Sequence, residues 1–161
     1  PQGAMNSLNP VLKIKRQMID AYRAHYPDHK LDQIMDLAHE AMRSVELPEH
    51  VLEMHPHELS GGMKQRVCIA IGILLRPQII IADEPTSALD VVTQRQVIET
   101  LNRVQQKIGS ALILIGHDMG LMAQSMDKVA VMYAGEIVEI NDVQTVFTSP
   151  KHPYTQALIS S

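Results

Sequence analysis

The sequence has a single cysteine, no tryptophan and no apolar run long enough to cross a bilayer. One cysteine, Cys68, excludes an internal disulfide, and its apolar surroundings indicate a small buried side chain in a reducing compartment. The longest apolar run, Val67–Leu75, is far shorter than the roughly 20 residues of a transmembrane helix, and no signal peptide is recognisable. Lysine and arginine form no block, and the net charge of -4 argues against nucleic-acid binding through the phosphate backbone.

What is present is enough for one domain with a hydrophobic core. The chain has 161 residues, of which 45% are hydrophobic, so a disordered chain is excluded. The first residue is Pro rather than Met and the chain begins in polar sequence, so we expect a fragment of a longer protein.

The N-terminal part of the sequence carries helix patterns but no strand pattern. Residues 1–10 are rich in Gly, Asn, Ser and Pro, as in a loop. Helices are expected at 11–25 and 31–45, the second because its apolar residues recur at three- and four-residue steps. A linker with two prolines follows at 46–58. We therefore expect an all-helical lobe over residues 11–59.

The central part alternates strands with helices. Short aliphatic runs at Ile79–Ala82 and Ala111–Ile115 are typical of parallel strands covered on both faces. Between them, Thr93–Ile108 is amphipathic and ends at Gly109. This alternation predicts an α/β fold with a parallel sheet.

The C-terminal part carries a hairpin pattern. Asp118 can cap a short helix, and strands are expected at 129–133 and 136–140, joined at Ala134-Gly135. The tail, 143–161, is expected to be partly helical.

Two carboxylates, Asp83 and Glu84, directly follow the first strand. Ligands of open α/β sheets bind beyond the carboxyl ends of the strands. Adjacent strand residues point to opposite sides, so one carboxylate can hold Mg²⁺ while the other orients and deprotonates an attacking water. The alternative is a strand that ends in a solvated acidic turn.

Ser60, Gly61 and Gly62 lie at the start of a predicted helix. Glycines let the backbone approach a ligand closely, and the N–H groups and dipole of a helix start favour an anion. The pattern therefore predicts a phosphate cradle, although an ordinary capped helix would use the same residues.

His117 follows the second strand, so it is expected at the same edge of the sheet as the two carboxylates. An imidazole there could contact a phosphate or steady the catalytic carboxylate. The alternative is a structural histidine in a turn. The other seven histidines show no spacing typical of metal ligands.

Together these motifs resemble the ATP-binding-cassette (ABC) ATPase family, and the resemblance covers essentially the whole chain. Leu59–Arg66 resembles the family's signature motif, Ile79–Glu84 its Walker B strand with the catalytic glutamate, and Ser87–Asp90 its D-loop. His117 resembles the switch histidine, and Gln2 the glutamine of the Q-loop. The implied fold is a P-loop NTPase-like (RecA-like) parallel sheet core, here incomplete, with the ABC all-helical subdomain.

The resemblance implies ATP and Mg²⁺ as cofactors, and an ATPase as the activity. Asp83 would support Mg²⁺ and Glu84 would polarise the attacking water. His117 would contact the γ-phosphate. Gln2 would sense Mg²⁺ and water, and would link the site to the membrane partner.

The resemblance also implies a second ATPase subunit as partner, because in this family two cassettes sandwich two ATP molecules head to tail. Ser60, Gly61 and Gly62 would bind ATP held by the opposite subunit, and Gln65 is also predicted to bind nucleotide. Asp90 would lie at the interface between cassettes. The helical lobe would dock on a transmembrane permease subunit.

The family's phosphate loop does not occur among these residues, since the sequence contains no Gly-x-x-x-x-Gly-Lys-Ser/Thr. In the family this loop and the aromatic residue that stacks on adenine lie upstream of Gln2. We therefore expect weak or no ATP binding, and no hydrolysis, by this chain alone. The strand that feeds the loop is also missing, which would leave apolar strand edges, so we expect self-association or strand rearrangement.

The C-terminal tail indicates which group of ABC ATPases the chain resembles. Thr148–Leu158 is similar to the segment that follows the cassette in oligopeptide, dipeptide and nickel importers, and Ser7–Pro10 and Ala88–Val91 are similar to that group as well. The alternative for the tail is an arbitrary linker that contains proline. The expected function is the ATP-hydrolysing subunit of an importer for peptides or a similar small solute, at the cytoplasmic face of the cell membrane.

Four segments are expected: a Q-loop segment (1–10), the helical subdomain (11–59), the C-terminal part of the ATPase core (60–142) and a C-terminal extension (143–161). One rival function is a soluble ABC ATPase that acts on DNA or ribosomes, but such proteins usually carry a long coiled-coil or zinc insertion, or paired cassettes. Another is a non-catalytic regulatory module, which would not need both a catalytic glutamate and a switch histidine.

Overall fold

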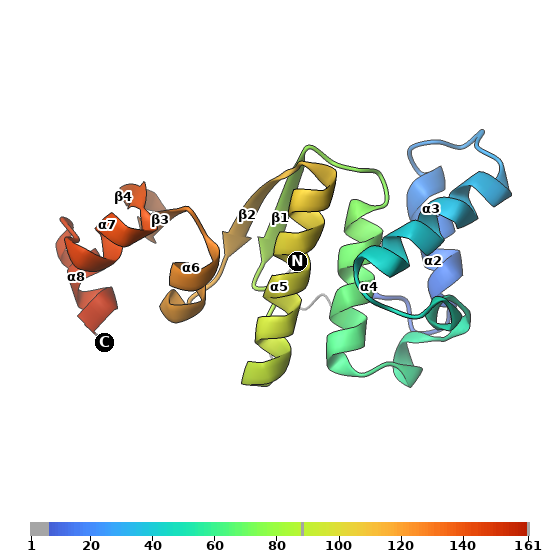
Figure 1. Ribbon diagram of the computed structural model, residues 1–161, viewed down its shortest axis with the longest axis horizontal. Helices are drawn as coiled ribbons and strands as arrows, with labels where there is room; N and C mark the ends of the chain where they lie inside the picture. The colour runs from blue at the N-terminus through green and yellow to red at the C-terminus, as the bar shows by residue number, and fades with distance from the viewer. Residues whose placement is uncertain (1–6, 88, 161) are drawn as a thin grey trace. The chain divides into compact units, whose positions relative to one another are not determined.

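The computed structural model describes residues 7–87 and 89–160 of the chain. They fall into two compact units, Pro1–Gly116 and His117–Ser161, and each is described by itself. Figure 1 shows the course of the chain through its helices and strands.

The first unit begins with two helices whose apolar stripes pack together. Helix α2 spans Ile14–Arg23 and α3 spans Leu31–Ser44, close to the bounds that the sequence predicts. The following side chains of this part are completely buried: Ile14, Met18, Ile34, Met42, Val45 and Val51. Only helices occur among the described residues from 14 to 58, as expected for an all-helical lobe.

Residues 46–58 are not an irregular linker but hold two short 3-10 helices. These are η1 (Glu49–Glu53) and η2 (Pro56–Glu58). Pro48 precedes the first of these helices and Pro56 begins the second. Proline suits a helix start because its φ is fixed near the helical value and because the N–H that it lacks would be unpaired there. The prolines that suggested a linker therefore start the two short helices.

The remainder of the first unit is an α/β arrangement, as predicted. Helices α4 (Gly61–Ile73) and α5 (Val91–Ile108) pack against each other, and α5 also packs on β2 (Figure 1). Strands β1 (Ile79–Asp83) and β2 (Ala111–Ile115) pair in parallel, in a register from Ile79 opposite Ala111 to Asp83 opposite Ile115. Val67 of α4 and Val97, Leu101 and Val104 of α5 are buried in this part of the core.

The prediction that both strands are covered on both faces is wrong for this chain. Ile79, Ile81, Ile113 and Ile115 are between 48% and 63% exposed. The register and the alternation of side chains place these four residues on one face of the two-stranded sheet. Ala82, which points to the other side, is buried. The strand sequences are therefore apolar on two faces, but in this chain only one face is covered.

The second unit is a β-hairpin with short helices around it. Strands β3 and β4 pair antiparallel with an irregularity between Val131 and Met132, and Val131 and Val146 form its small core. The elements, in chain order, are α6 (Met119–Ser125), β3 (Lys128–Tyr133), β4 (Glu136–Asp142), α7 (Val143–Thr148) and α8 (Pro153–Ser160). The hairpin and the partly helical tail are as predicted.

The hairpin turn is formed by Ala134 and Gly135, which have φ angles of 49° and 85°. Two successive left-handed residues are the mark of a type I′ turn, whose twist matches that of the flanking strands.

Across the parts of the chain that the structure describes, no helix is both long and apolar enough to pass through a membrane.

Candidate functional site

The start of helix α4 has the geometry of a capped helix N-terminus. Ser60 has extended backbone angles, and its Oγ accepts a hydrogen bond of 3.3 Å from the amide of Met63. Gly61 and Gly62 form the first turn, where backbone N–H groups point out of the helix and the helix dipole favours an anion. Ser60 is exposed, so this turn can be reached from solvent.

Gly62 allows α4 to approach α5 closely. A Cβ atom at position 62 would lie only 2.7 Å from the Cγ2 methyl of Thr93, in the first turn of α5. Thr93 in turn donates from its hydroxyl to one carboxylate oxygen of Asp90 at 2.6 Å, and from its amide to the other at 3.0 Å. Thr93 is thus bonded to Asp90 and lies against the backbone of Gly62.

Asp90 caps α5, and the same hydrogen bonds affect its ionisation. The bond from the Thr93 hydroxyl, followed by the bond from the Thr93 amide, lowers the pKa of Asp90 below its ordinary value of 3.8. Its carboxylate is therefore charged at neutral pH, at the positive end of the α5 dipole.

Asp83 and Glu84 lie at the carboxyl end of β1, and both are half-buried. The main chain turns sharply at Glu84, which has a φ angle of 44°. A left-handed conformation is uncommon for a residue that carries a Cβ, and in this structure Glu46, Arg76 and Ala134 share it, so by itself it marks a sharp turn.

Two backbone hydrogen bonds hold Glu84 in this conformation. Its amide donates to the carbonyl oxygen of Ile115 at 2.9 Å, and its carbonyl oxygen accepts from Ser87 at 3.2 Å. The first bond ties Glu84 to the end of β2, and the second closes the turn that follows. The Glu84 side chain therefore leaves the sheet edge from a fixed backbone position.

Asp83 has the ligand chemistry that Mg²⁺ prefers. Asp83 offers a carboxylate at a strand end, and Mg²⁺ commonly takes only one or two protein carboxylates, completing its shell with water and phosphate oxygens. No cluster of three or more His, Cys, Asp or Glu suited to a metal ion occurs among residues 7–87 and 89–160. A binding mode in which phosphate supplies the other ligands is consistent with that composition.

Three further residues are predicted for the site, namely His117, Gln65 and Gln2. His117 is exposed and is the first residue of the second unit, whereas Glu84 belongs to the first. Gln65 is only 7% exposed, within the packed side of α4, and its contact with nucleotide stays a prediction. Gln2, predicted to belong to the Q-loop, lies outside the described residues.

Sequence reasoning missed Thr93 and Gln94 of α5. Part of the signal for Thr93 was present, because an Asp at a helix N-cap commonly accepts from the amide three residues later. No local pattern indicates Gln94, whose side-chain amide donates to the carbonyl oxygen of Thr86 at 3.2 Å.

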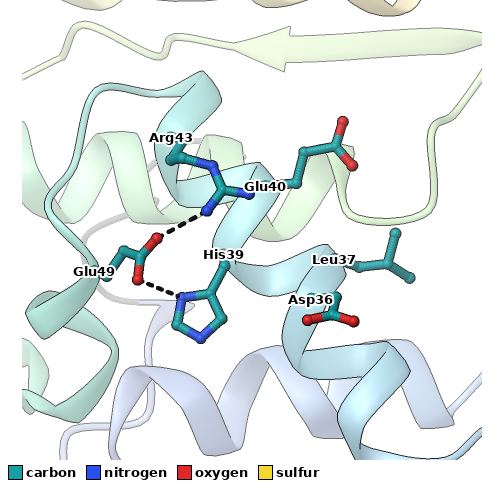
Figure 2. A pocket seen from close by; sticks show the side chains of 6 residues that line it. All are labelled: Asp36, Leu37, His39, Glu40, Arg43 and Glu49. Carbon is teal, nitrogen blue, oxygen red and sulfur yellow. Dashed lines mark hydrogen bonds and ion pairs between the residues drawn. The ribbon is translucent and has the colours of Figure 1, made fainter.

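A cavity of about 460 Å³ lies elsewhere in the first unit, on the helical part (Figure 2). In its wall, one carboxylate oxygen of Glu49 accepts from Arg43 at 2.8 Å and the other lies 3.2 Å from Nδ1 of His39. Glu40, also in its wall, pairs with Arg76 at 2.9 Å. None of the predicted nucleotide-binding residues lines this cavity, so it is not the candidate site.

Comparison with known proteins identifies the family. Residues 2–87 match the ABC transporter family, and this matched range includes Leu59–Arg66 and the Asp83-Glu84 pair. The chain is 46% identical over 160 residues to the dipeptide transport ATP-binding protein DppD of Escherichia coli K12, in an alignment that covers 98% of this chain and 49% of DppD. The chain thus spans about half the length of the curated relatives it matches.

Solved structures show the same fold. The cbiO1 protein of Clostridium perfringens, part of the ABC transporter complex cbiONQ, superposes with a TM-score of 0.81 at 26% identity, covering 92% of this chain and 57% of that one. MJ0796, a bacterial ABC transporter cassette solved as a dimer, gives a TM-score of 0.71 at 26% identity, covering 85% and 59%. Together with the family match over residues 2–87, these likenesses show that the chain belongs to the ABC transporter family.

Proposed function

We propose that the protein containing this chain is the ATP-hydrolysing subunit of a membrane ABC importer for peptides or a similar small solute. The observation that carries the proposal is the adjacent carboxylate pair Asp83 and Glu84 at the carboxyl end of β1, with the backbone of Glu84 held by two hydrogen bonds. The importer branch rests on the 46% identity to a dipeptide transport ATP-binding protein and on the tail segment Thr148–Leu158.

Each residue has a role in this proposal. Asp83 supplies a carboxylate to Mg²⁺, and Glu84 accepts a proton from the water that attacks the γ-phosphate. His117 donates a hydrogen bond to that phosphate, and Gln2 senses Mg²⁺ and water. Mg²⁺, when bound, neutralises charge on the phosphate oxygens.

A second set of residues acts across an interface between two cassettes. Ser60, Gly61 and Gly62 bind phosphate oxygens of ATP held by the opposite cassette, with Gln65 nearby, and Asp90 lies at the interface. A solved cassette with the same fold is dimeric, which supports this arrangement. ATP binding would bring two cassettes together, and hydrolysis would let them separate.

The partners that follow are a second ATPase subunit, identical or different, and transmembrane permease subunits. Residues 11–59 form the subdomain that docks on the permease, residues 60–142 the catalytic part and residues 143–161 an extension. The protein would lie at the cytoplasmic face of the cell membrane, held there by its permease.

The test is hydrolysis by the complete protein with Glu84→Gln. This variant keeps the size and hydrogen-bonding ability of the side chain but cannot accept the proton. It should still bind ATP and form the dimer, while turnover falls by about two orders of magnitude or more. Unchanged turnover would remove Glu84 from the mechanism, and failure of the wild-type protein to hydrolyse ATP would refute the ATPase proposal.

For the 161-residue chain alone we propose neither ATP hydrolysis nor tight ATP binding, because its sequence holds no phosphate-loop motif. Micromolar affinity in a calorimetric titration would contradict this. We also propose that the isolated chain self-associates through its apolar strand edges. The exposed apolar face formed by Ile79, Ile81, Ile113 and Ile115 would add to this tendency. A monomer in light scattering would count against it.

A further inference from the structure

Gln94 connects two motifs that the proposed function requires to act together. Its side-chain Nε2 donates to the carbonyl oxygen of Thr86 at 3.2 Å, and its backbone amide donates to the carbonyl oxygen of Asp90 at 2.9 Å. Thr86 lies two residues after Glu84, and Asp90 ends the D-loop. The bond to Asp90 is the first backbone bond of α5, so what the half-buried Gln94 side chain adds is the bond to Thr86, just before the D-loop.

The bond to Thr86 completes the support of Glu84. On one side, the Glu84 amide is held by Ile115 of β2 at 2.9 Å. On the other side, the turn is closed by the bond from the Ser87 amide to the Glu84 carbonyl at 3.2 Å. The Thr86 carbonyl oxygen, which lies inside the turn, accepts from the Leu89 amide at 3.3 Å and from Gln94 at 3.2 Å, and the bond from Gln94 is the one that attaches the turn to a long helix.

We infer that Gln94 is a positioning residue for ATP hydrolysis, which fixes the turn carrying Glu84 relative to Asp90 at the cassette interface. This inference rests on the proposed function. Gln94 does not touch the reacting atoms in it: the side chain acts through the Thr86 carbonyl on the backbone of Glu84. Loss of the bond lets the turn shift, and a displacement of about 1 Å of a catalytic group can cost about 100-fold in rate.

The helix itself offers a matched control. Near the far end of α5, the side chain of Gln105 donates to the carbonyl oxygen of Ser110 at 2.6 Å, which is the same kind of bond to a main-chain oxygen. Replacing either glutamine with methionine keeps the length and helix propensity of the side chain and removes the donor. Each variant therefore loses one side-chain bond to a main-chain oxygen, 3.2 Å long at Gln94 and 2.6 Å long at Gln105, but only the bond of Gln94 lies at the turn after Glu84.

The experiment measures kcat and KM for ATP in the complete protein assembled with its permease. Gln94→Met should lower kcat by roughly 10-fold or more and leave KM within about twofold, because the phosphate-binding residues are not changed. Gln105→Met should leave both constants at the wild-type level. The thermal midpoints of the two variants should fall by similar amounts, about a few degrees.

A rescue variant makes the test independent of folding effects. Gln94→Lys restores an N–H donor, one bond further from the backbone and positively charged, and it should recover part of the lost kcat. Equal kcat in Gln94→Met and Gln105→Met, or a raised KM with unchanged kcat, would overturn the inference. So would a Gln94→Lys variant as slow as Gln94→Met. These results leave the ATPase proposal intact, since that proposal is tested separately by Glu84→Gln.

Discussion

The contact between Gly62 and Thr93 makes a quantitative prediction about how closely α4 and α5 pack. In Gly62→Ala the new Cβ would lie 2.7 Å from the Thr93 methyl carbon, whereas carbon atoms in contact normally lie about 3.5–4.0 Å apart. Thr93 cannot easily rotate away, because its hydroxyl is bonded to Asp90 at 2.6 Å. Either that bond breaks or the two helices move apart.

The size of the effect follows from a comparison within the same helix. Gly72, near the end of α4, has no atom within 4 Å of the position of an added Cβ, and it is exposed. Gly72→Ala should therefore gain about 0.5–1 kcal/mol of stability from helix propensity alone. Gly62→Ala should lose about 1–3 kcal/mol to overpacking, offset in part by the same gain. The two variants should differ by about 1–3 kcal/mol.

The assay is urea unfolding of the 161-residue chain, followed by far-UV circular dichroism because the chain has no tryptophan. Thr93→Ser removes the methyl group and keeps the hydroxyl that binds Asp90, so it should relieve the cost of Gly62→Ala in the double variant. If Gly62→Ala stabilises the chain as much as Gly72→Ala, or if Thr93→Ser gives no relief, the reasoning is wrong.

Three further predictions concern other parts of the chain. The Glu139 carboxylate accepts from the amides of His152 and Lys151, at 3.0 Å each, and these bonds lower the pKa of Glu139 below the ordinary 4.5. Protection of both amides from hydrogen exchange should therefore be complete above pH about 4.5 and decline as the pH falls through the lowered pKa. In Glu139→Gln, the protection should be weak at every pH. Burial raises the pKa of the Cys68 thiol, so alkylation by iodoacetamide near pH 8 should be much slower in the folded chain than in urea, and equal rates would contradict its burial. Leu101 is 2% exposed, so Leu101→Ala should cost about 2–5 kcal/mol in urea unfolding, and a loss below about 1 kcal/mol would contradict its place in the core.

Most of the fold could be predicted from the sequence because its signals are local. The apolar periodicity of 31–45 gave the bounds of α3 almost to the residue, and Ala134-Gly135 marked the hairpin turn. Helix starts at Ser60, Asp90 and Asp118 depend on a side chain that bonds to an amide three residues later, so they too are short-range features. The linker expected at 46–58 was wrong because proline can start a helix as well as end one.

The candidate site could be predicted only in part. The order of the motifs pointed to Asp83 and Glu84 and to the signature segment, which now belong to one compact unit. The left-handed backbone of Glu84 could not be predicted, since it depends on a bond from its amide to Ile115 on a neighbouring strand. Glutamate has no intrinsic preference for that conformation.

The sequence by itself determined the elements, the family and the identity of the residues expected to meet the nucleotide, because these depend on residue type, order and periodicity. Only the tertiary structure decided that Thr93 joins Gly62 to Asp90, that Gln94 holds the turn after Glu84, and that one face of the β1–β2 sheet is exposed. The physical reason is that such contacts arise from the packing of whole helices and strands. The residue pattern of an aliphatic strand is the same whether or not another element covers its face, so the sequence cannot reveal the exposure.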